Sequence, residues 1–175
     1  MLKRIRKVFL VWEFEKEEKW LNEMSAKGLQ LHSVGYCRYD FEVGTPGEYV
    51  YRLEMLEYTP GHAESVQYIK FLEETGVEYI GSMLRWVYFR KKAETGGFDL
   101  YSDIASRIRH VERIAAMMTV FLGFNMFNFF NALHNGYVSV ALKVMCAVAT
   151  LLFGYGVIRL LLMRRRLKRD KILYE

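Results

Sequence analysis

The sequence predicts an α+β domain followed by two membrane-spanning helices. Apolar and polar side chains alternate through residues 29–43, which is the pattern of a half-buried strand. Apolar residues recur at spacings of three and four after residues 13 and 62, which is the pattern of amphipathic helices. From residue 114 the chain runs for twenty residues without a charge, enough for a helix of ~30 Å that crosses one hydrocarbon core.

The first half of the soluble part reads as strand, helix and strand. Residues 3–12 are rich in Val, Ile and aromatic residues and predict the first strand. Residues 13–27 predict a helix that stops at Gly28. Residues 29–43 predict one long strand, and a turn at residues 44–47 follows it.

The second half continues with strand, helix and strand. Residues 49–55 alternate again and predict the return strand of a hairpin, residues 62–75 a helix, and residues 77–92 a last strand. The order β-α-β-β-α-β predicts a ferredoxin-like sandwich, in which one antiparallel sheet carries both helices on one face. We therefore expect residues 1–98 to form a cytosolic α+β domain.

The remainder predicts a membrane hairpin. Its expected parts are a juxtamembrane amphipathic helix capped by Ser102 or Asp103, a two-helix transmembrane hairpin, and a basic cytosolic tail; they cover residues 99–113, 114–163 (about 114–133 and 137–163) and 164–175. Lys and Arg flank the outer ends of both spans, and the loop between the spans has neither. The positive-inside rule then predicts a multi-pass protein of the cell (inner or plasma) membrane with both termini in the cytosol.

Charge and motifs argue against several functions. Residues 1–113 hold 17 Lys and Arg against 18 Asp and Glu, so the soluble part lacks the basic patch of a nucleic-acid-binding domain. The two cysteines, Cys37 and Cys146, fall in different parts of the chain and do not suggest a disulfide framework. The sequence has no Cys-x-x-Cys, His-Glu-x-x-His or phosphate-loop motif. We therefore expect no catalytic residues, no metal and no cofactor.

One sheet face is a candidate binding surface. His32, Tyr36 and Arg38 alternate with apolar residues that point to the core, and Arg52 lies on the strand predicted beside them. An aromatic ring with two guanidinium groups supplies both stacking and charge-assisted hydrogen bonds. The alternative is an ordinary sheet face that is solvated or covered by the juxtamembrane helix.

A second candidate is a polar seam inside the membrane spans. Asn125, Asn128 and Asn131 recur every three residues, and Lys143 lies at a similar depth in the second span. An ionisable group inside a membrane is a candidate functional site. The alternative is that Lys143 extends toward the outer surface or bonds the asparagines and has only a structural role.

The soluble part resembles a bacterial family called domain of unknown function 2812, whose members are often found near PadR-type transcriptional regulators. The resemblance covers roughly residues 5–107 and rests on Trp20-Leu21-Asn22 with Met24 and Gly28, Tyr39 and Phe41, Tyr49-x-Tyr51-Arg52, Trp86-x-Tyr88-Phe89-Arg90-Lys91, and Ser102-Asp103 with Ser106-Arg107. The family has no assigned activity. The resemblance implies a membrane-linked role near transcriptional control and transfers no catalytic residue.

These observations favour a membrane-anchored, non-enzymatic module with a sensory, regulatory or protein-interaction role. Its expected partners are membrane lipid and an unidentified protein or small ligand, with a homodimer as a further option and no nucleic acid. The alternative is an accessory subunit of a membrane transporter or envelope complex, in which the membrane helices carry the specific contacts.

Overall fold

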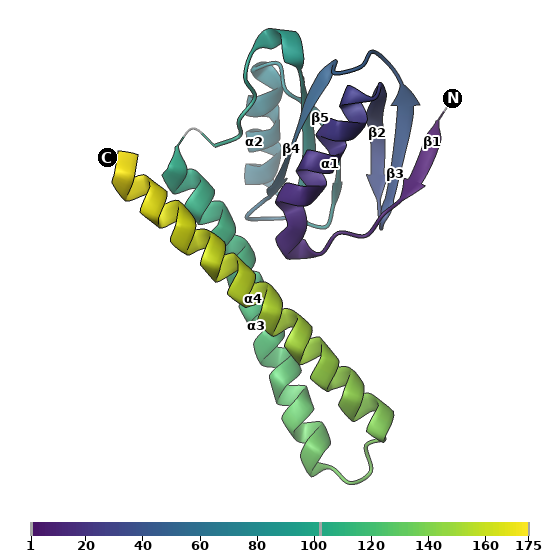
Figure 1. The fold of residues 1–175 in the computed structure, drawn as a ribbon, viewed down its shortest axis with the longest axis vertical. Helices are drawn as coiled ribbons and strands as arrows, with labels where there is room; N and C mark the ends of the chain where they lie inside the picture. Colours follow the sequence, from purple (N-terminus) through teal and green to yellow (C-terminus); the bar gives the residue numbers. More distant parts are fainter. Residues whose placement is uncertain (1, 102, 175) are drawn as a thin grey trace. The chain divides into compact units, whose positions relative to one another are not determined.

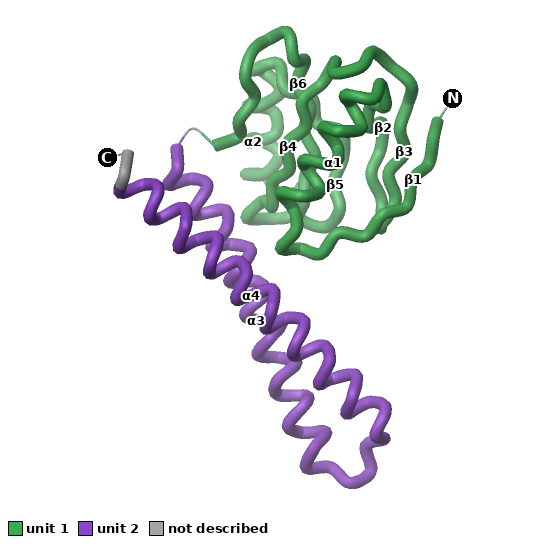
Figure 2. The backbone as a smooth tube through the Cα atoms, viewed as in Figure 1, with its two compact units in different colours: residues 1–102 green, residues 103–175 purple. Residues whose placement is uncertain are grey.

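The computed structural model describes residues 2–101 and 103–174 (Figure 1). The chain forms two compact units, Met1–Ser102 and Asp103–Glu175 (Figure 2). Unit 1 is an α+β domain, and unit 2 consists of two long helices. The elements of unit 1 are, in order, β1 (Lys3–Arg6), η1 (Val11–Glu13), α1 (Phe14–Ala26), β2 (Leu29–Gly35), β3 (Arg38–Val43), β4 (Tyr49–Met55), α2 (Ala63–Glu74), β5 (Glu78–Met83), β6 (Trp86–Lys92) and η2 (Ala93–Thr95).

Unit 1 is built from two copies of one β-α-β-β arrangement. The first copy runs β1-α1-β2-β3 and forms a three-stranded sheet in the order β1-β3-β2. The second runs β4-α2-β5-β6 and forms a sheet in the order β4-β6-β5. In both sheets every pair of neighbouring strands is antiparallel. The two copies therefore share their element order and their strand pairing.

Local details repeat at a spacing of 48 residues. Gly28 and Gly76 follow the two helices with φ angles of 76° and 80°, a conformation that glycine adopts without steric cost. The β2–β3 pairing shifts register after Leu31, and the β5–β6 pairing shifts after Tyr79. These coincidences allow a residue of one copy to be matched with its counterpart in the other.

The predicted strand at residues 29–43 is wrong, because this segment is a hairpin of β2 and β3. A two-residue turn at positions 36–37 pairs Gly35 with Arg38. Odd-numbered residues of β2 therefore share a face with even-numbered residues of β3 next to the turn. The bulge after Leu31 adds one residue to β2, so that beyond it odd-numbered residues pair with odd-numbered residues, as Leu31 does with Phe41. The alternation of the sequence therefore continues through the turn and hides it.

The ferredoxin-like arrangement is also wrong. Residues 77–92 form the β5–β6 hairpin, not one strand, and β4 pairs with β6 instead of returning along β3. The result is two three-stranded sheets where one sheet was expected. The first strand is shorter than predicted, since β1 ends at Arg6.

The two sheets are joined at the edge strand β2. The backbone N–H of Leu31, beside the bulge, donates to the Tyr51 hydroxyl at 2.8 Å, and its carbonyl accepts from Arg90 at 3.3 Å. Side chains of the second sheet thus satisfy backbone groups on the edge of β2 that faces away from β3. Further along, a Cβ placed on Gly81 of β5 would approach Val34 of β2 at 3.4 Å, so these strands lie close together.

The helices of unit 1 were predicted correctly. Helix α1 lies across β2 and β4 and buries Leu21 and Met24 (Figure 1). Helix α2 begins after His62, whose ring accepts a hydrogen bond from the Glu64 backbone, and it buries Ile69. The core on the second sheet consists of Leu56, Ile69, Val77, Val87, Phe89 and Phe98.

Unit 2 contains α3 (Ile104–His134) and α4 (Val140–Tyr174), which pack side by side along their length (Figure 2). Asp103 caps α3 by accepting a hydrogen bond from the Ser106 backbone at 2.6 Å, as predicted, while the alternative cap Ser102 lies outside the described residues. The expected juxtamembrane segment is the first part of α3, with no break before the apolar part.

Both helices of unit 2 are long and apolar enough to cross a membrane. Only 17% and 11% of the residues in their most apolar stretches are buried, whereas the core helix of a soluble protein is mostly buried. At the end where α3 starts and α4 finishes, Glu112 pairs with Arg164 at 2.5 Å and with Lys168 at 3.7 Å. These pairs connect the two helices outside their uncharged segments.

Candidate functional site

Three of the four residues of the predicted binding face lie on the β2–β3 hairpin. His32 is beside the bulge in β2 and approaches Glu42 at 3.7 Å. Tyr36 is in the two-residue turn and is 88% exposed. Arg38 begins β3 and pairs with Asp40 at 3.3 Å. These residues are accessible, but His32 and Arg38 each already lie beside a carboxylate of β3.

Arg52 does not join them. It lies on β4 in the other sheet, where its guanidinium pairs with Glu18 of α1 at 3.4 Å and donates to the Tyr51 carbonyl at 3.0 Å. The prediction grouped the four residues because it placed β4 beside β3. Since β4 pairs with β6, the structure does not bring Arg52 to the hairpin that carries the other three.

The asparagines of the membrane seam bond to their own helix. The side-chain amides of Asn125, Asn128 and Asn131 donate to backbone carbonyls four residues earlier, at 3.1, 2.7 and 3.0 Å. Such bonds satisfy polar side chains inside a helix without an external partner. Lys143 is partly buried on α4, and the described contacts do not link it to the three asparagines. The amide groups of the three asparagines therefore have hydrogen-bond acceptors within α3 itself.

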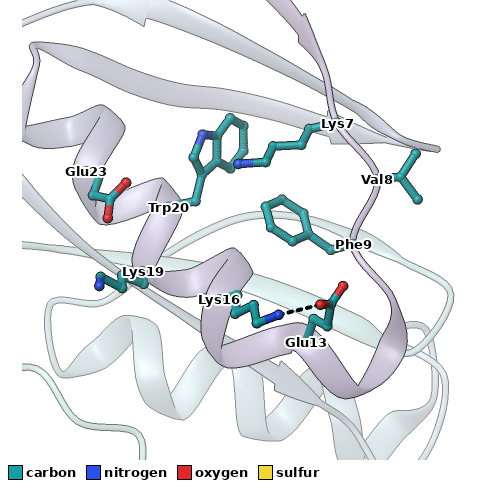
Figure 3. Close-up of a pocket in the computed structure, with 8 residues that line it drawn as sticks. All are labelled: Lys7, Val8, Phe9, Glu13, Lys16, Lys19, Trp20 and Glu23. Atoms are coloured by element: carbon teal, nitrogen blue, oxygen red, sulfur yellow. Dashed lines mark hydrogen bonds and ion pairs between the residues drawn. The ribbon is translucent and has the colours of Figure 1, made fainter. Parts of the chain in front are cut away.

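A different set of residues forms a groove beside α1 (Figure 3). It has a volume of about 350 Å³ and lies between the segment that follows β1 and the outer face of α1. Phe9 and Trp20 supply its aromatic wall, with their ring centroids 5.5 Å apart. The full lining is Lys7, Val8, Phe9, Glu13, Lys16, Lys19, Trp20 and Glu23.

Lys7 extends over the aromatic wall of the groove (Figure 3). Its ammonium nitrogen lies 4.6 Å from the Trp20 ring centroid and 4.8 Å from that of Phe9, within range of a cation–π contact. Two carboxylates line the same groove, but Glu13 pairs with Lys16 at 2.6 Å. Lys7 thus presents its charge to the ring faces.

Below the groove lies a buried carboxylate. Trp20 packs edge-on against Tyr39, with centroids 4.9 Å apart, and the Tyr39 hydroxyl donates to Glu17 at 2.6 Å. The Tyr88 hydroxyl donates to the same carboxylate oxygen at 2.7 Å. Glu17 is on α1, Tyr39 on β3 and Tyr88 on β6, so this cluster ties one helix to both sheets.

The electrostatics of this cluster follow from its burial. Burial raises the pKa of Glu17 above its usual value, and the hydrogen bonds from Tyr39 and Tyr88 offset part of that rise. Burial, together with the neighbouring carboxylate, raises the pKa of both tyrosines far above the ordinary range. The two hydroxyls therefore remain protonated donors at every physiological pH.

A family model matches the part of the chain that contains α1 and both sheets except β1. The family described as Protein of unknown function (DUF2812) matches residues 13–122, which is more than half of the sequence. The chain belongs to the DUF2812 family. Searches of curated proteins and of solved structures gave no match.

The DUF2812 match includes Glu17, Trp20, Tyr39 and Tyr88, but it begins after Lys7. It also extends past unit 1 into α3, so the family region contains the start of the first long helix. One wall of the groove, which carries Trp20, therefore lies inside the family region, while the segment that carries Lys7 precedes it.

Sequence reasoning missed the groove and the buried cluster. Glu17 stands in an acidic stretch of the sequence, yet its side chain is only 8% exposed. One signal was available, because Glu17 is three residues before Trp20 and four before Leu21, which places it on the same side of the helix as apolar residues. No comparable signal connects Lys7 with Trp20, since only the fold brings these residues together.

Proposed function

We propose that this protein is a membrane-anchored, non-enzymatic module with a sensory, regulatory or protein-interaction role. The observation that supports it is the composition of unit 2, whose two long apolar helices leave most of their apolar side chains exposed. Exposed apolar surface of this extent is costly in water and favourable in hydrocarbon. In this proposal α3 and α4 cross the cell (inner or plasma) membrane as a hairpin.

The charge distribution supports an orientation with both termini in the cytosol. Residues 164–171 include six Lys and Arg against one Asp, and Arg107, Arg109 and Arg113 lie near the start of α3. The connection between the helices, residues 135–139, has neither Lys nor Arg. By the positive-inside rule this charge distribution supports a cytosolic location of unit 1.

The binding role is proposed for unit 1. Its groove combines aromatic side chains with lysines at an accessible surface, which suits recognition of a partner or small ligand. A binding function is favoured over catalysis because the sequence has no Cys-x-x-Cys, His-Glu-x-x-His or phosphate-loop motif. The role near PadR-type regulators that the family resemblance implies remains part of this proposal.

The test is capture of partners from native membranes. The full-length protein is extracted in mild detergent, and co-purifying proteins are compared between the wild type and the Trp20→Phe variant. A regulatory or interaction module predicts a partner whose recovery falls in the variant. If the recovered proteins are transporter or envelope subunits whose recovery depends instead on Asn128 and Lys143, the accessory-subunit alternative replaces the proposal.

A further inference from the structure

The second β-α-β-β copy shows what stands at the place that corresponds to the groove of the first copy. The backbone N–H of Lys7 donates to the Cys37 carbonyl in the β2–β3 turn at 3.3 Å. The backbone N–H of Leu56 donates to the Arg85 carbonyl in the β5–β6 turn at 2.8 Å. Cys37 and Arg85 are 48 residues apart, the spacing of the repeat. Lys7 and Leu56 are 49 residues apart, but each follows its strand and bonds to the corresponding turn residue, so they are counterparts.

The two counterparts have opposite environments. Leu56 is 3% exposed and belongs to the hydrophobic core of the second copy, whereas Lys7 is exposed and extends over aromatic rings. The helix position of Trp20 corresponds to Tyr68, which packs against that core and donates its hydroxyl to Glu54 at 2.7 Å. In the second copy this place is filled by core side chains.

The hollow is therefore not required by the β-α-β-β arrangement. At this place the second copy has the buried Leu56 with Tyr68 packed beside it, whereas the first copy has the exposed Lys7 and a groove of about 350 Å³. This volume is at the lower end of the range for small-molecule sites, so the groove suits a ligand of one or two rings. The wall formed by Phe9 and Trp20 provides faces on which a planar ring can stack.

The charged side chains that line the groove favour a negatively charged ligand. Three lysines and two glutamates line the groove, and the Glu13–Lys16 pair leaves Lys7 and Lys19 against Glu23, an excess of one positive charge. The Lys7 ammonium already occupies the position over the rings that a cationic ligand would take. An anionic group can pair with Lys7 while the attached ring contacts the aromatic wall, so the groove complements a negative ligand.

We propose that this groove binds a small planar aromatic anion. On binding, the ring of the ligand takes the place of the Lys7 ammonium over Trp20 and Phe9, and the displaced ammonium pairs with the carboxylate or equivalent group of the ligand. The inference rests on the proposed binding role of unit 1 and names the chemical class of its ligand. It does not depend on how unit 2 associates with the membrane.

The experiment uses the full-length protein in lipid nanodiscs and isothermal titration with three matched probes. Naphthalene-2-carboxylate has the proposed ring and charge, naphthalen-2-ylmethylammonium has the ring with the opposite charge, and cyclohexanecarboxylate has the charge without the aromatic ring. Titrations into empty nanodiscs are subtracted to remove partition into lipid. The proposal predicts saturable binding of the aromatic anion and at least about tenfold weaker binding of the other two probes.

Two substitutions test the site. Lys7→Gln removes the charge from an exposed position and is expected to weaken naphthalene-2-carboxylate binding by about tenfold or more, the loss of one charged hydrogen bond. Lys70→Gln, on the exposed face of α2, is the matched control and should leave binding unchanged. Trp20→Phe keeps an aromatic wall but reduces its area, and it should weaken the anion without reversing the order of the probes.

The proposal is overturned if the ammonium probe binds as tightly as the carboxylate, if no probe saturates, or if Lys7→Gln binds the anion as well as the wild type does. These outcomes are separate from the proposed function. Partner capture that persists without probe binding refutes the ligand assignment alone. Probe binding by a protein that captures no partner refutes the interaction role and leaves the ligand site in place.

Discussion

Replacement of Glu17 tests whether the buried cluster holds α1 against both sheets. The Glu17 carboxylate accepts hydrogen bonds from the hydroxyls of Tyr39 and Tyr88, which are 4% and 2% exposed. Glu17→Ala leaves both hydroxyls without this acceptor. A buried polar group that loses its partner costs about 1–3 kcal/mol, so the free energy of unfolding should fall by roughly 2–6 kcal/mol.

Glu17→Gln is the matched variant, because it keeps an acceptor oxygen at the same place without the charge. The charged form of Glu17 is disfavoured by burial, so the amide should be within about 1 kcal/mol of the wild type at pH 7. The measurement is urea unfolding of the full-length protein in mild detergent, followed by tryptophan fluorescence. All three tryptophans, Trp12, Trp20 and Trp86, are in unit 1, so the signal reports on that unit.

The pH dependence adds an independent check. The folded pKa of Glu17 is above its unfolded value of about 4.3, so the folded state binds more protons between these two values. The contribution of Glu17 to stability is complete below pH ~4.3 and is lost as the pH rises through the folded pKa. The wild type should therefore lose stability relative to Glu17→Gln over that window. Equal stability of Glu17→Ala and the wild type, or a difference that grows in the opposite direction with pH, would refute the reasoning.

Three further predictions concern topology, independence and exposure. Reporter fusions after residues 1 and 175 should both indicate the cytosol, and an external signal at either end would contradict the two-span hairpin. A fragment of residues 1–98 should give a dispersed NMR spectrum, because both sheets and both of their helices lie within it; a collapsed spectrum would show that it needs the rest of the chain. Tyr36→Ala should change the free energy of unfolding by less than about 0.5 kcal/mol, since Tyr36 is 88% exposed, whereas Phe41→Ala should cost about 3–5 kcal/mol because Phe41 is fully buried. Urea unfolding compares the two, and a similar loss for both would contradict the burial assigned to them.

The sequence determined where the helices of the chain lie. Apolar spacings of three and four, followed by Gly28 and Gly76, located α1 and α2 because helix periodicity and glycine ends are local properties. The long uncharged segments identified the apolar parts of α3 and α4 for the same reason, since length and composition need no tertiary partner. Motif order and spacing in the soluble part also identified the DUF2812 family.

The tertiary structure decided the strand pairing and the groove. The hairpin turns contain Cys37 and Leu84 at φ angles of 51° and 58°, so neither has the glycine or asparagine that normally marks such a turn. The bulge in β2 preserved the alternation that a turn should have broken. Glu17 is buried because Tyr39 and Tyr88 reach it from two different sheets, and Lys7 meets Trp20 across 13 positions of sequence. Such contacts depend on the packing of distant segments, which local patterns of hydrophobicity do not encode.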